Sequence, residues 1–238
     1  LSGPPGTGKS LTGHVLANIA CSLGFKVYDV KTPLLMDFAP ASAPRKIRHG
    51  FKSARKNEKS MVIFDEAEAF ARTRRETHGS TEEEKSDALV QLLIEIEGIA
   101  TTPDCSLVVV LISNRPELLD AALLRSGRVG LHLKFPYPRT KEGRKEILLI
   151  HAKNNKRMPE ENKDEWLDTI AESTEGLTGA DLKELLSDAG TIAAIPYAEQ
   201  CKALGKTDKL SNIPDKAFIE LDHLLAAKDA LMTKIKTA

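Results

Sequence analysis

Short apolar segments alternate with amphipathic helical patterns in the first part of the chain. Four segments rich in β-branched and aromatic residues are predicted strands: residues 25–30, 61–64, 107–113 and 129–135. Residues 61–64 and 107–112 are apolar without alternation, which is typical of strands that are covered on both faces. The sequence therefore predicts a central, mostly parallel sheet with helices on its faces.

The clearest helical pattern follows residue 80. Thr81 and Glu84 have the spacing of a capping box, apolar residues follow at i+3 and i+4 spacing, and Gly98 is the predicted stop. After Pro138 the strand patterns end, and the remaining predicted helices cover residues 142–154, 166–172, a segment capped by Thr178 and Asp181, and 218–232. We therefore predict an α/β domain at residues 1–138 and a small all-α domain at residues 139–238.

Composition narrows the functional classes. The 238 residues contain 34 Lys and Arg against 34 Asp and Glu, and this balance is not that of a generally basic nucleic-acid binder. The longest apolar run, residues 107–112, is much shorter than the roughly 20 residues of a membrane span, so no membrane segment is expected. Cys21, Cys105 and Cys201 are far apart and lack zinc-ligand spacing. They predict buried, reduced thiols and a cytoplasmic location.

The first motif with a clear chemistry is Gly3-Pro4-Pro5-Gly6-Thr7-Gly8-Lys9-Ser10, which matches GxxxxGK[ST]. Its glycines allow positive φ and a close approach of backbone N–H groups to phosphate oxygens. A helix that starts at Lys9 and continues through Leu11 would point its positive end at the same anion. Lys9 is expected to reach the β- and γ-phosphates and Ser10 to bind Mg²⁺. A flexible Gly/Pro loop is the alternative.

Two adjacent acids, Asp65 and Glu66, end the apolar segment that starts at Met61. Side chains at the carboxyl end of a parallel strand line the crevice where ligands bind. Asp65 is therefore expected to hold Mg²⁺ through water, and Glu66 to polarise a water for attack on the γ-phosphate. An ordinary solvated strand end is the alternative. Glu68 is expected to be a solvated helix residue.

Asn114 follows the next apolar segment. Its amide can both donate and accept hydrogen bonds, so it could orient the attacking water. Because Arg115 and Pro116 come next, Asn114 is equally compatible with a turn.

In this order, these motifs resemble those of the AAA family, the branch of AAA+ ATPases that includes proteasomal regulatory ATPases, AAA proteases and segregases. Six segments carry the resemblance: residues 3–10 (Walker A), 62–66 (Walker B), 112–116 (sensor 1), 118–128 (arginine fingers), 135–138 (the exit into the lid) and 176–181 (sensor 2). The resemblance implies a P-loop αβα sandwich with a helical lid. It also implies a homo- or hetero-oligomeric ring, usually a hexamer, with ATP and Mg²⁺ at the subunit interfaces.

The same resemblance implies that Arg125 and Arg128 act on the γ-phosphate of a neighbouring subunit; two surface arginines near a turn are the alternative. The predicted site is thus the catalytic residues Glu66, Asn114, Arg125 and Arg128, the Mg²⁺ ligands Ser10 and Asp65, and the nucleotide-binding residues Gly3, Pro4, Pro5, Gly6, Thr7, Gly8, Lys9, Ser10, Leu11 and Asp65.

Three features depart from the family pattern. The stretch around Phe38 lacks the aromatic-hydrophobic-glycine triplet of the pore loop, so Phe38 is a candidate for either a loop anchor or a substrate contact. The relay sequence of many members is present as Ile96-Glu97-Gly98-Ile99, without its aromatic residue. Only Leu1 and Ser2 precede the phosphate loop, which predicts that strand 1 is mostly missing and that the sequence is N-terminally truncated.

These observations predict an ATP-hydrolysing, ring-forming AAA ATPase that remodels or unfolds a protein substrate. A nucleotide-dependent assembly or binding module without substrate threading is the alternative, which the unusual Phe38 stretch favours. A small-molecule P-loop kinase fits less well, because Glu66, Asn114 and the paired arginines suit water activation at a subunit interface. The chain contains no HExxH sequence and thus no zincin-type protease centre.

Overall fold

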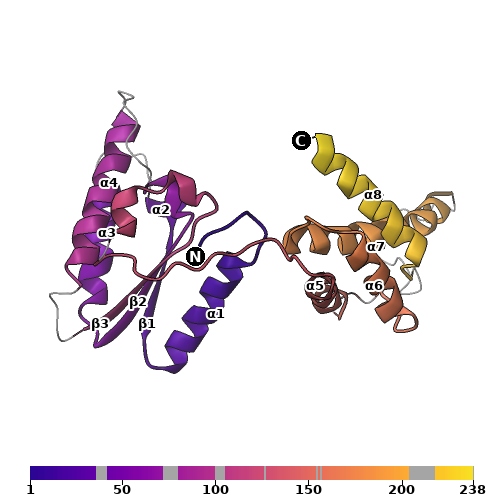
Figure 1. The fold of residues 1–238 in the computed structure, drawn as a ribbon, viewed down its shortest axis with the longest axis horizontal. Coiled ribbons are helices and arrows are strands. Elements are labelled where there is room, and N and C mark those ends of the chain that lie inside the picture. The colour runs from indigo at the N-terminus through magenta and orange to yellow at the C-terminus, as the bar shows by residue number, and fades with distance from the viewer. Residues whose placement is uncertain are drawn as a thin grey trace. The chain divides into compact units, whose positions relative to one another are not determined.

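The chain forms two compact units, Leu1–Phe135 and Pro136–Ala238, and each is described by itself (Figure 1). The computed structural model describes residues 1–35, 42–71, 80–99, 105–125, 127–153, 155, 157–203 and 218–237. The described elements of the first unit are α1 (Lys9–Ser22), β1 (Lys26–Lys31), α2 (Thr32–Leu35), α3 (Ser42–Ala54), β2 (Lys59–Asp65), η1 (Ala67–Ala69), α4 (Ser80–Glu97), β3 (Ser106–Leu111), η2 (Pro116–Leu118) and η3 (Ala121–Leu124). Those of the second unit are α5 (Lys141–Lys153), α6 (Lys163–Glu172), α7 (Gly179–Ala203) and α8 (Leu221–Thr237).

A parallel sheet forms the centre of the first unit, as the sequence predicts. Its described strands have the order β1-β2-β3, and both neighbouring pairs are parallel. Lys31 lies beside Asp65 in the register, and Phe64 lies beside Leu111. The ends of all three strands therefore meet at one edge, where the predicted site residues lie.

The sheet continues past β3 through a very short segment at Leu1–Gly3. Ser2 bridges Ser113 on one side and Lys134 on the other, both in parallel. The backbone nitrogen of Phe135 donates a hydrogen bond to the carbonyl oxygen of Ser2 at 2.7 Å. The predicted strand at 129–135 is wrong apart from this single bridge at Lys134. The pairing with Ser2 extends only from the Leu133 carbonyl, which accepts from the Ser2 nitrogen at 2.9 Å, to the Phe135 nitrogen.

Helices cover both faces of the sheet, with α1 on one side and α3 and α4 on the other (Figure 1). Alternation along β2 explains both layers, because successive side chains of a strand point to opposite faces. Val62 and Phe64 belong to the core formed with α3 and α4, whereas Met61 and Ile63 pack with Ala20 of α1. The first unit is therefore the predicted αβα sandwich.

Phe51 and Phe64 anchor the larger of these two layers. Both are fully buried, and their ring centroids are 6.2 Å apart. Burying a side chain of this size contributes about 1.5–3 kcal/mol relative to leaving it exposed. The opposite layer is thinner, and α1 exposes an apolar stripe that consists of Leu11, Val15, Ile19 and the adjacent Leu23.

The second unit is an all-α bundle with its own core. Leu148 of α5, Leu167 of α6, Leu185 of α7 and Leu224 of α8 are fully buried in one cluster. The predicted capping box at the start of α7 is confirmed. The backbone nitrogen of Thr178 donates to the Asp181 carboxylate at 2.8 Å, and the nitrogen of Asp181 donates to the Thr178 hydroxyl at 3.2 Å.

The other predicted capping box is wrong. Helix α4 begins by Ser80, so Thr81 and Glu84 lie within the helix and Thr81 cannot be its N-cap. The predicted end of this helix is confirmed, because α4 ends at Glu97 and the nitrogen of Gly98 closes the last turn on Ile94 at 3.0 Å.

The described cysteines are less buried than the sequence predicts. Cys21 is exposed and Cys105 is half-buried, so the prediction of buried thiols is wrong for Cys21, which lies on the outer side of α1. The side chain of Cys201 lies outside the described residues. Of the helices that the structure describes, none combines the length and apolar character needed to cross a membrane.

Candidate functional site

The loop between Ser2 and α1 has the backbone that its glycines predict. Gly6 and Gly8 have φ values of 77° and 91°, in the left-handed region that favours glycine. Gly3 lies so close to Phe135 that a Cβ atom would overlap the Phe135 carbonyl oxygen. Helix α1 starts at Lys9, with Gly8 as its N-cap residue. The loop thus presents backbone N–H groups and the positive end of α1 at one place, which is the arrangement that binds phosphate.

Lys9 is folded back onto this loop. Its side chain donates to the carbonyl oxygen of Pro4 at 2.5 Å and to the hydroxyl of Thr7 at 3.4 Å, and the residue is only 3% exposed. Burial lowers the pKa of Lys9, while the negative charges of Glu68 and Asp65 oppose this shift. A buried ammonium gains strongly from a new anionic partner, so Lys9 suits phosphate binding at this position.

Asp65 ends β2 and is fixed from two directions. Its backbone carbonyl accepts a hydrogen bond from the hydroxyl of Thr32, a buried residue at the start of α2. Its carboxylate accepts a hydrogen bond from the backbone nitrogen of Glu66 at 2.9 Å. These contacts set the position of Asp65 without using all of its oxygen lone pairs, so the carboxylate can still accept further donors or a cation.

Glu66 has a strained backbone and an exposed side chain. Its φ and ψ of 56° and 42° lie in the left-handed region, which is costly for a residue with a Cβ atom. The turn allows the backbone nitrogen of Ala67 to donate to the carbonyl of Ile112 at 2.9 Å. Strain of this kind is concentrated at functional sites. Here the strained turn at Glu66 ends β2 and sends the chain away from the sheet directly after Asp65.

Glu68 corrects an expectation from the sequence. It is buried, at 8% exposure, and is not a solvated helix residue. Its carboxylate accepts a hydrogen bond from the backbone nitrogen of Asn114 at 3.1 Å and lies close enough to Lys9 to oppose the lowering of that pKa. The turn after Glu66 brings Glu68 against the backbone of Asn114. Glu68 therefore links the segment after β2 to the segment after β3, and Asn114 is held at its backbone.

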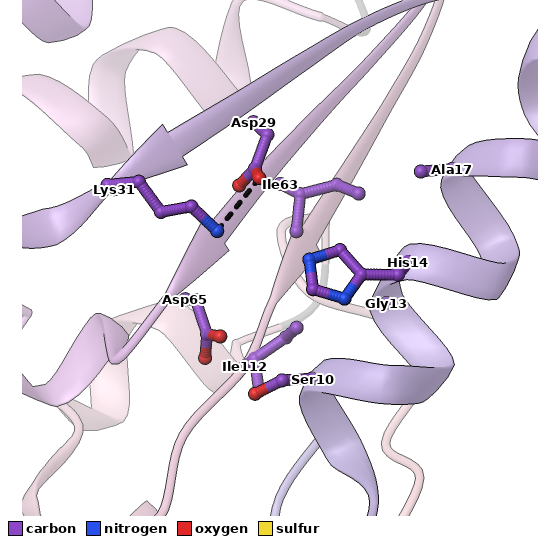
Figure 2. Close-up of a pocket in the computed structure, with 9 residues that line it drawn as sticks. All are labelled: Ser10, Gly13, His14, Ala17, Asp29, Lys31, Ile63, Asp65 and Ile112. Carbon is purple, nitrogen blue, oxygen red and sulfur yellow. Dashed lines mark ion pairs between the residues drawn. The ribbon is translucent and has the colours of Figure 1, made fainter. Parts of the chain in front are cut away.

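Ser10 and Asp65 line one small pocket at the edge of the sheet (Figure 2). The pocket has a volume of about 20 Å³, which is room for a water molecule or a single ion. A hydroxyl and a carboxylate are hard oxygen donors, and Mg²⁺ typically takes few protein ligands and keeps several waters. The residues present therefore fit a magnesium ion, next to a loop that fits phosphate.

Asp29 and Lys31 line the same pocket, and sequence reasoning missed both. They come from β1, and the Lys31 ammonium lies 2.9 Å from the Asp29 carboxylate. Their position at the carboxyl end of a predicted parallel strand is the signal that could have found them.

The two predicted arginine fingers differ in their surroundings. Arg125 is exposed at the end of η3. Arg128 donates to the carboxylate of Glu97 from Nε at 2.9 Å and from Nη2 at 2.5 Å, and to the carbonyl of Ala122 at 2.6 Å. Neither arginine lines the pocket of Ser10 and Asp65.

Phe38, the candidate loop anchor or substrate contact, lies outside the described residues.

Comparison with known proteins agrees with this geometry. A family model described as "ATPase family associated with various cellular activities (AAA)" matches residues 1–137, and a model of the AAA+ lid domain matches residues 165–202. The chain is 35% identical to "ATP-dependent zinc metalloprotease FtsH 1" of Thermoanaerobacter sp. (strain X514), over 96% of the chain and 38% of that protein. It is also 35% identical to "Proteasome-activating nucleotidase" of Methanopyrus kandleri, over 98% of the chain and 47% of that protein.

The chain thus spans less than half the length of these curated relatives. The family match nevertheless covers more than half of the chain and includes the phosphate loop, the two acids at the end of β2, Asn114 and both arginines. With its P-loop sandwich and lid, the chain belongs to the AAA family of ATPases.

Proposed function

We propose that the chain is the ATP-hydrolysing module of a ring-forming, protein-remodelling ATPase. The observation that carries the proposal is the joint placement of Ser10 and Asp65 in one pocket, next to a phosphate-type loop that holds Lys9. The same edge of the sheet carries Glu66 and Asn114. We also propose that the nucleotide domain extends to Pro138 and that the lid follows it.

In this proposal, residues 3–8 bind the phosphates through backbone N–H groups, and Leu11 and Ser10 continue the binding surface onto α1. Lys9 releases its contact with the Pro4 carbonyl and donates to the β- and γ-phosphates. Ser10 and Asp65 would hold Mg²⁺, which when bound offsets the negative charge of the phosphates. The fixed backbone of Asp65 keeps its carboxylate in place for this role.

Glu66 is the proposed general base. Its exposed carboxylate would take a proton from the water that attacks the γ-phosphorus, and such a base typically contributes 10²- to 10⁴-fold in rate. Asn114 would orient that water through its side-chain amide, because its backbone is already fixed by Glu68. The strained turn at Glu66 fits this role, since it separates the general base from the metal ligand Asp65.

Arg125 and Arg128 are the proposed fingers for the site of a neighbouring subunit. The planar guanidinium stays charged and contacts several phosphate oxygens at once, and a finger supplied in trans is typically worth 10³- to 10⁵-fold in rate. Arg125 is exposed and available for such a contact. Arg128 would have to leave Glu97 and the Ala122 carbonyl first.

A protein substrate is proposed from the relatives. One is named a proteasome-activating nucleotidase and several are named ATP-dependent zinc metalloproteases. The first name links a nucleotidase to the proteasome, and the second links ATP to proteolysis. We do not propose a zinc site like that in the name of the metalloproteases, because the chain has no HExxH sequence. We propose a reducing, cytoplasmic location, which the free thiols of Cys21 and Cys105 support.

Three measurements on the full-length protein test the proposal. Glu66→Gln should keep ATP binding and lose turnover, and the specific ATPase activity of the native protein should rise with its concentration as rings form. A fluorescent protein with an unstructured tail should lose its fluorescence in the presence of ATP but not with the Glu66→Gln variant. Turnover that is independent of concentration and unchanged by Arg128→Ala would contradict the role of Arg128 in trans.

A further inference from the structure

A second cation, Lys31, shares the pocket of the proposed magnesium ligands. Asp29 and Lys31 are two residues apart on β1, so their side chains emerge on the same face of the sheet, the face that α1 covers. Lys31 is the direct neighbour of Asp65 in the parallel register. Figure 2 shows the Lys31 ammonium paired to Asp29, with Asp65 and Ser10 below it in this view.

Lys31 interacts electrostatically with both acids. The hydrogen bond to Asp29 raises the pKa of Lys31, partial burial lowers it, and the charges of Asp29 and Asp65 raise it again. The Asp65 charge therefore acts on Lys31 across the pocket, although the hydrogen bond of Lys31 goes to Asp29. A positive charge in this place partly substitutes for a metal ion and repels one that arrives.

Of the two acids, Lys31 contacts Asp29. The ammonium lies 2.9 Å from the Asp29 carboxylate, and among the described residues no ion pair is formed between Lys31 and Asp65. The side chains of Lys31 and Asp29 are 48% and 39% exposed. A pair this exposed is weak, so breaking it costs little free energy.

We propose that Lys31 and Asp29 together set the magnesium dependence of nucleotide binding. Lys31 competes with Mg²⁺ for the charge of Asp65, and Asp29 limits this competition by holding Lys31 at the rim of the pocket. This inference rests on the proposed function, because it assumes that Ser10 and Asp65 bind the metal of a nucleotide complex. It assigns a new role to two residues of β1 that the family motifs do not include.

The proposal predicts opposite effects for the two members of the pair. Lys31→Gln removes the competing cation, so half-saturation should need about three- to tenfold less Mg²⁺, while ADP binding without metal should weaken. Asp29→Asn frees Lys31 to approach Asp65, so more Mg²⁺ should be needed and metal-free ADP binding should strengthen. In the double variant the effect of Asp29→Asn should disappear, because Lys31 carries it.

The test measures binding and needs no turnover. The full-length protein is titrated with a fluorescent ADP analogue in excess Mg²⁺ and in EDTA, and then with Mg²⁺ at fixed analogue. Mn²⁺ binding in the presence of ADP, followed by electron paramagnetic resonance, gives a second readout. Lys31→Arg keeps the positive charge, so the ratio of its affinities for the ADP analogue in Mg²⁺ and in EDTA should match that of the native protein. Lys26→Gln is the matched control, because it removes the same charge from the exposed, opposite end of β1.

The outcomes separate this inference from the proposed function. Opposite shifts for Lys31→Gln and Asp29→Asn, with Lys26→Gln unchanged, support the inference. If nucleotide binds normally but Lys31→Gln behaves like Lys26→Gln, or if both pocket variants shift in one direction, the inference is overturned and the proposed function stands. If the native protein binds no nucleotide with or without metal, both are overturned.

Discussion

Arg128 and Glu97 connect a proposed arginine finger to the end of α4. The guanidinium contacts the carboxylate from two nitrogens, at 2.9 and 2.5 Å, and a third contact reaches the Ala122 carbonyl at 2.6 Å. The Arg128 side chain is 17% exposed, whereas that of Glu97 is 55% exposed. Glu97 lies in the stretch that resembles the relay sequence of the family, so this contact joins two segments of a proposed interface within one chain.

Glu97→Gln should lower the protein concentration that assembly-dependent ATP hydrolysis requires. Because Arg128 must leave Glu97 to reach a neighbour, weakening their contact lowers the cost of that step by about 0.2–1 kcal/mol, the usual range for ion pairs at the surface. The protein concentration at half-maximal specific ATPase activity should therefore fall by up to about fivefold. The same titration on Glu58→Gln, an exposed acid before β2 in the chain, is the control. A higher half-maximal concentration would mean instead that Glu97 holds the finger in its working position.

Lys9→Met should raise the thermal stability of the nucleotide-free protein at neutral pH and abolish its stabilisation by ADP. The reason is that the ammonium of Lys9 is buried and its pKa is lowered, chiefly by that burial. The unfolded chain holds this proton more tightly, so the cost of the charged form is fully present below the lowered pKa.

This cost is lost as the pH rises through the lowered pKa towards the ordinary value of 10.5. The difference in unfolding midpoint between Lys9→Met and the native protein should therefore shrink across that window in a thermal unfolding series. Lys26→Met, at an exposed position, is the control. A difference that grows with pH would contradict the sign of this assignment.

Glu66→Gly should separate the effect of the strained backbone at residue 66 on stability from the role of its side chain in catalysis. Glycine adopts the left-handed conformation of residue 66 without the penalty of about 1–2 kcal/mol that a Cβ atom brings. The variant should therefore unfold at higher urea concentration than the native protein, yet lose turnover as Glu66→Gln does. Asn162→Gly is the matched control, since Asn162 has a similar φ of 59° but asparagine tolerates this region better. Equal gains at both positions would argue against special strain at Glu66.

Local sequence patterns predicted those features that depend on neighbours in the chain. The start of α1 at Lys9 follows from the glycines before it, and the cap of α7 follows from the spacing of Thr178 and Asp181. The burial of Glu68 could not be predicted in this way, because it depends on a turn that brings it against Asn114, 46 residues later. The same holds for Lys31, whose importance arises only when β1 pairs with β2 and places it beside Asp65.

Gly3→Ala should damage the sheet and the phosphate loop together. A Cβ atom at this position would overlap the Phe135 carbonyl oxygen, and the φ of 150° is one that side chains rarely adopt. The backbone must shift, and the 2.7 Å hydrogen bond from Phe135 to Ser2 is the nearest contact to break. Overpacking of this kind costs about 1–3 kcal/mol, so the urea midpoint should fall.

Nucleotide binding should weaken in the same variant, because Gly3 begins the loop that holds Lys9. Gly130→Ala is the control: a Cβ atom there meets no atom within 4 Å and needs no left-handed backbone. Its unfolding midpoint and affinity for ADP should match those of the native protein. If Gly3→Ala kept native ADP affinity while losing stability, the loop would be independent of its contact with Phe135. Loss of both, with Gly130→Ala unchanged, would show that the last short pairing of the sheet positions the phosphate loop.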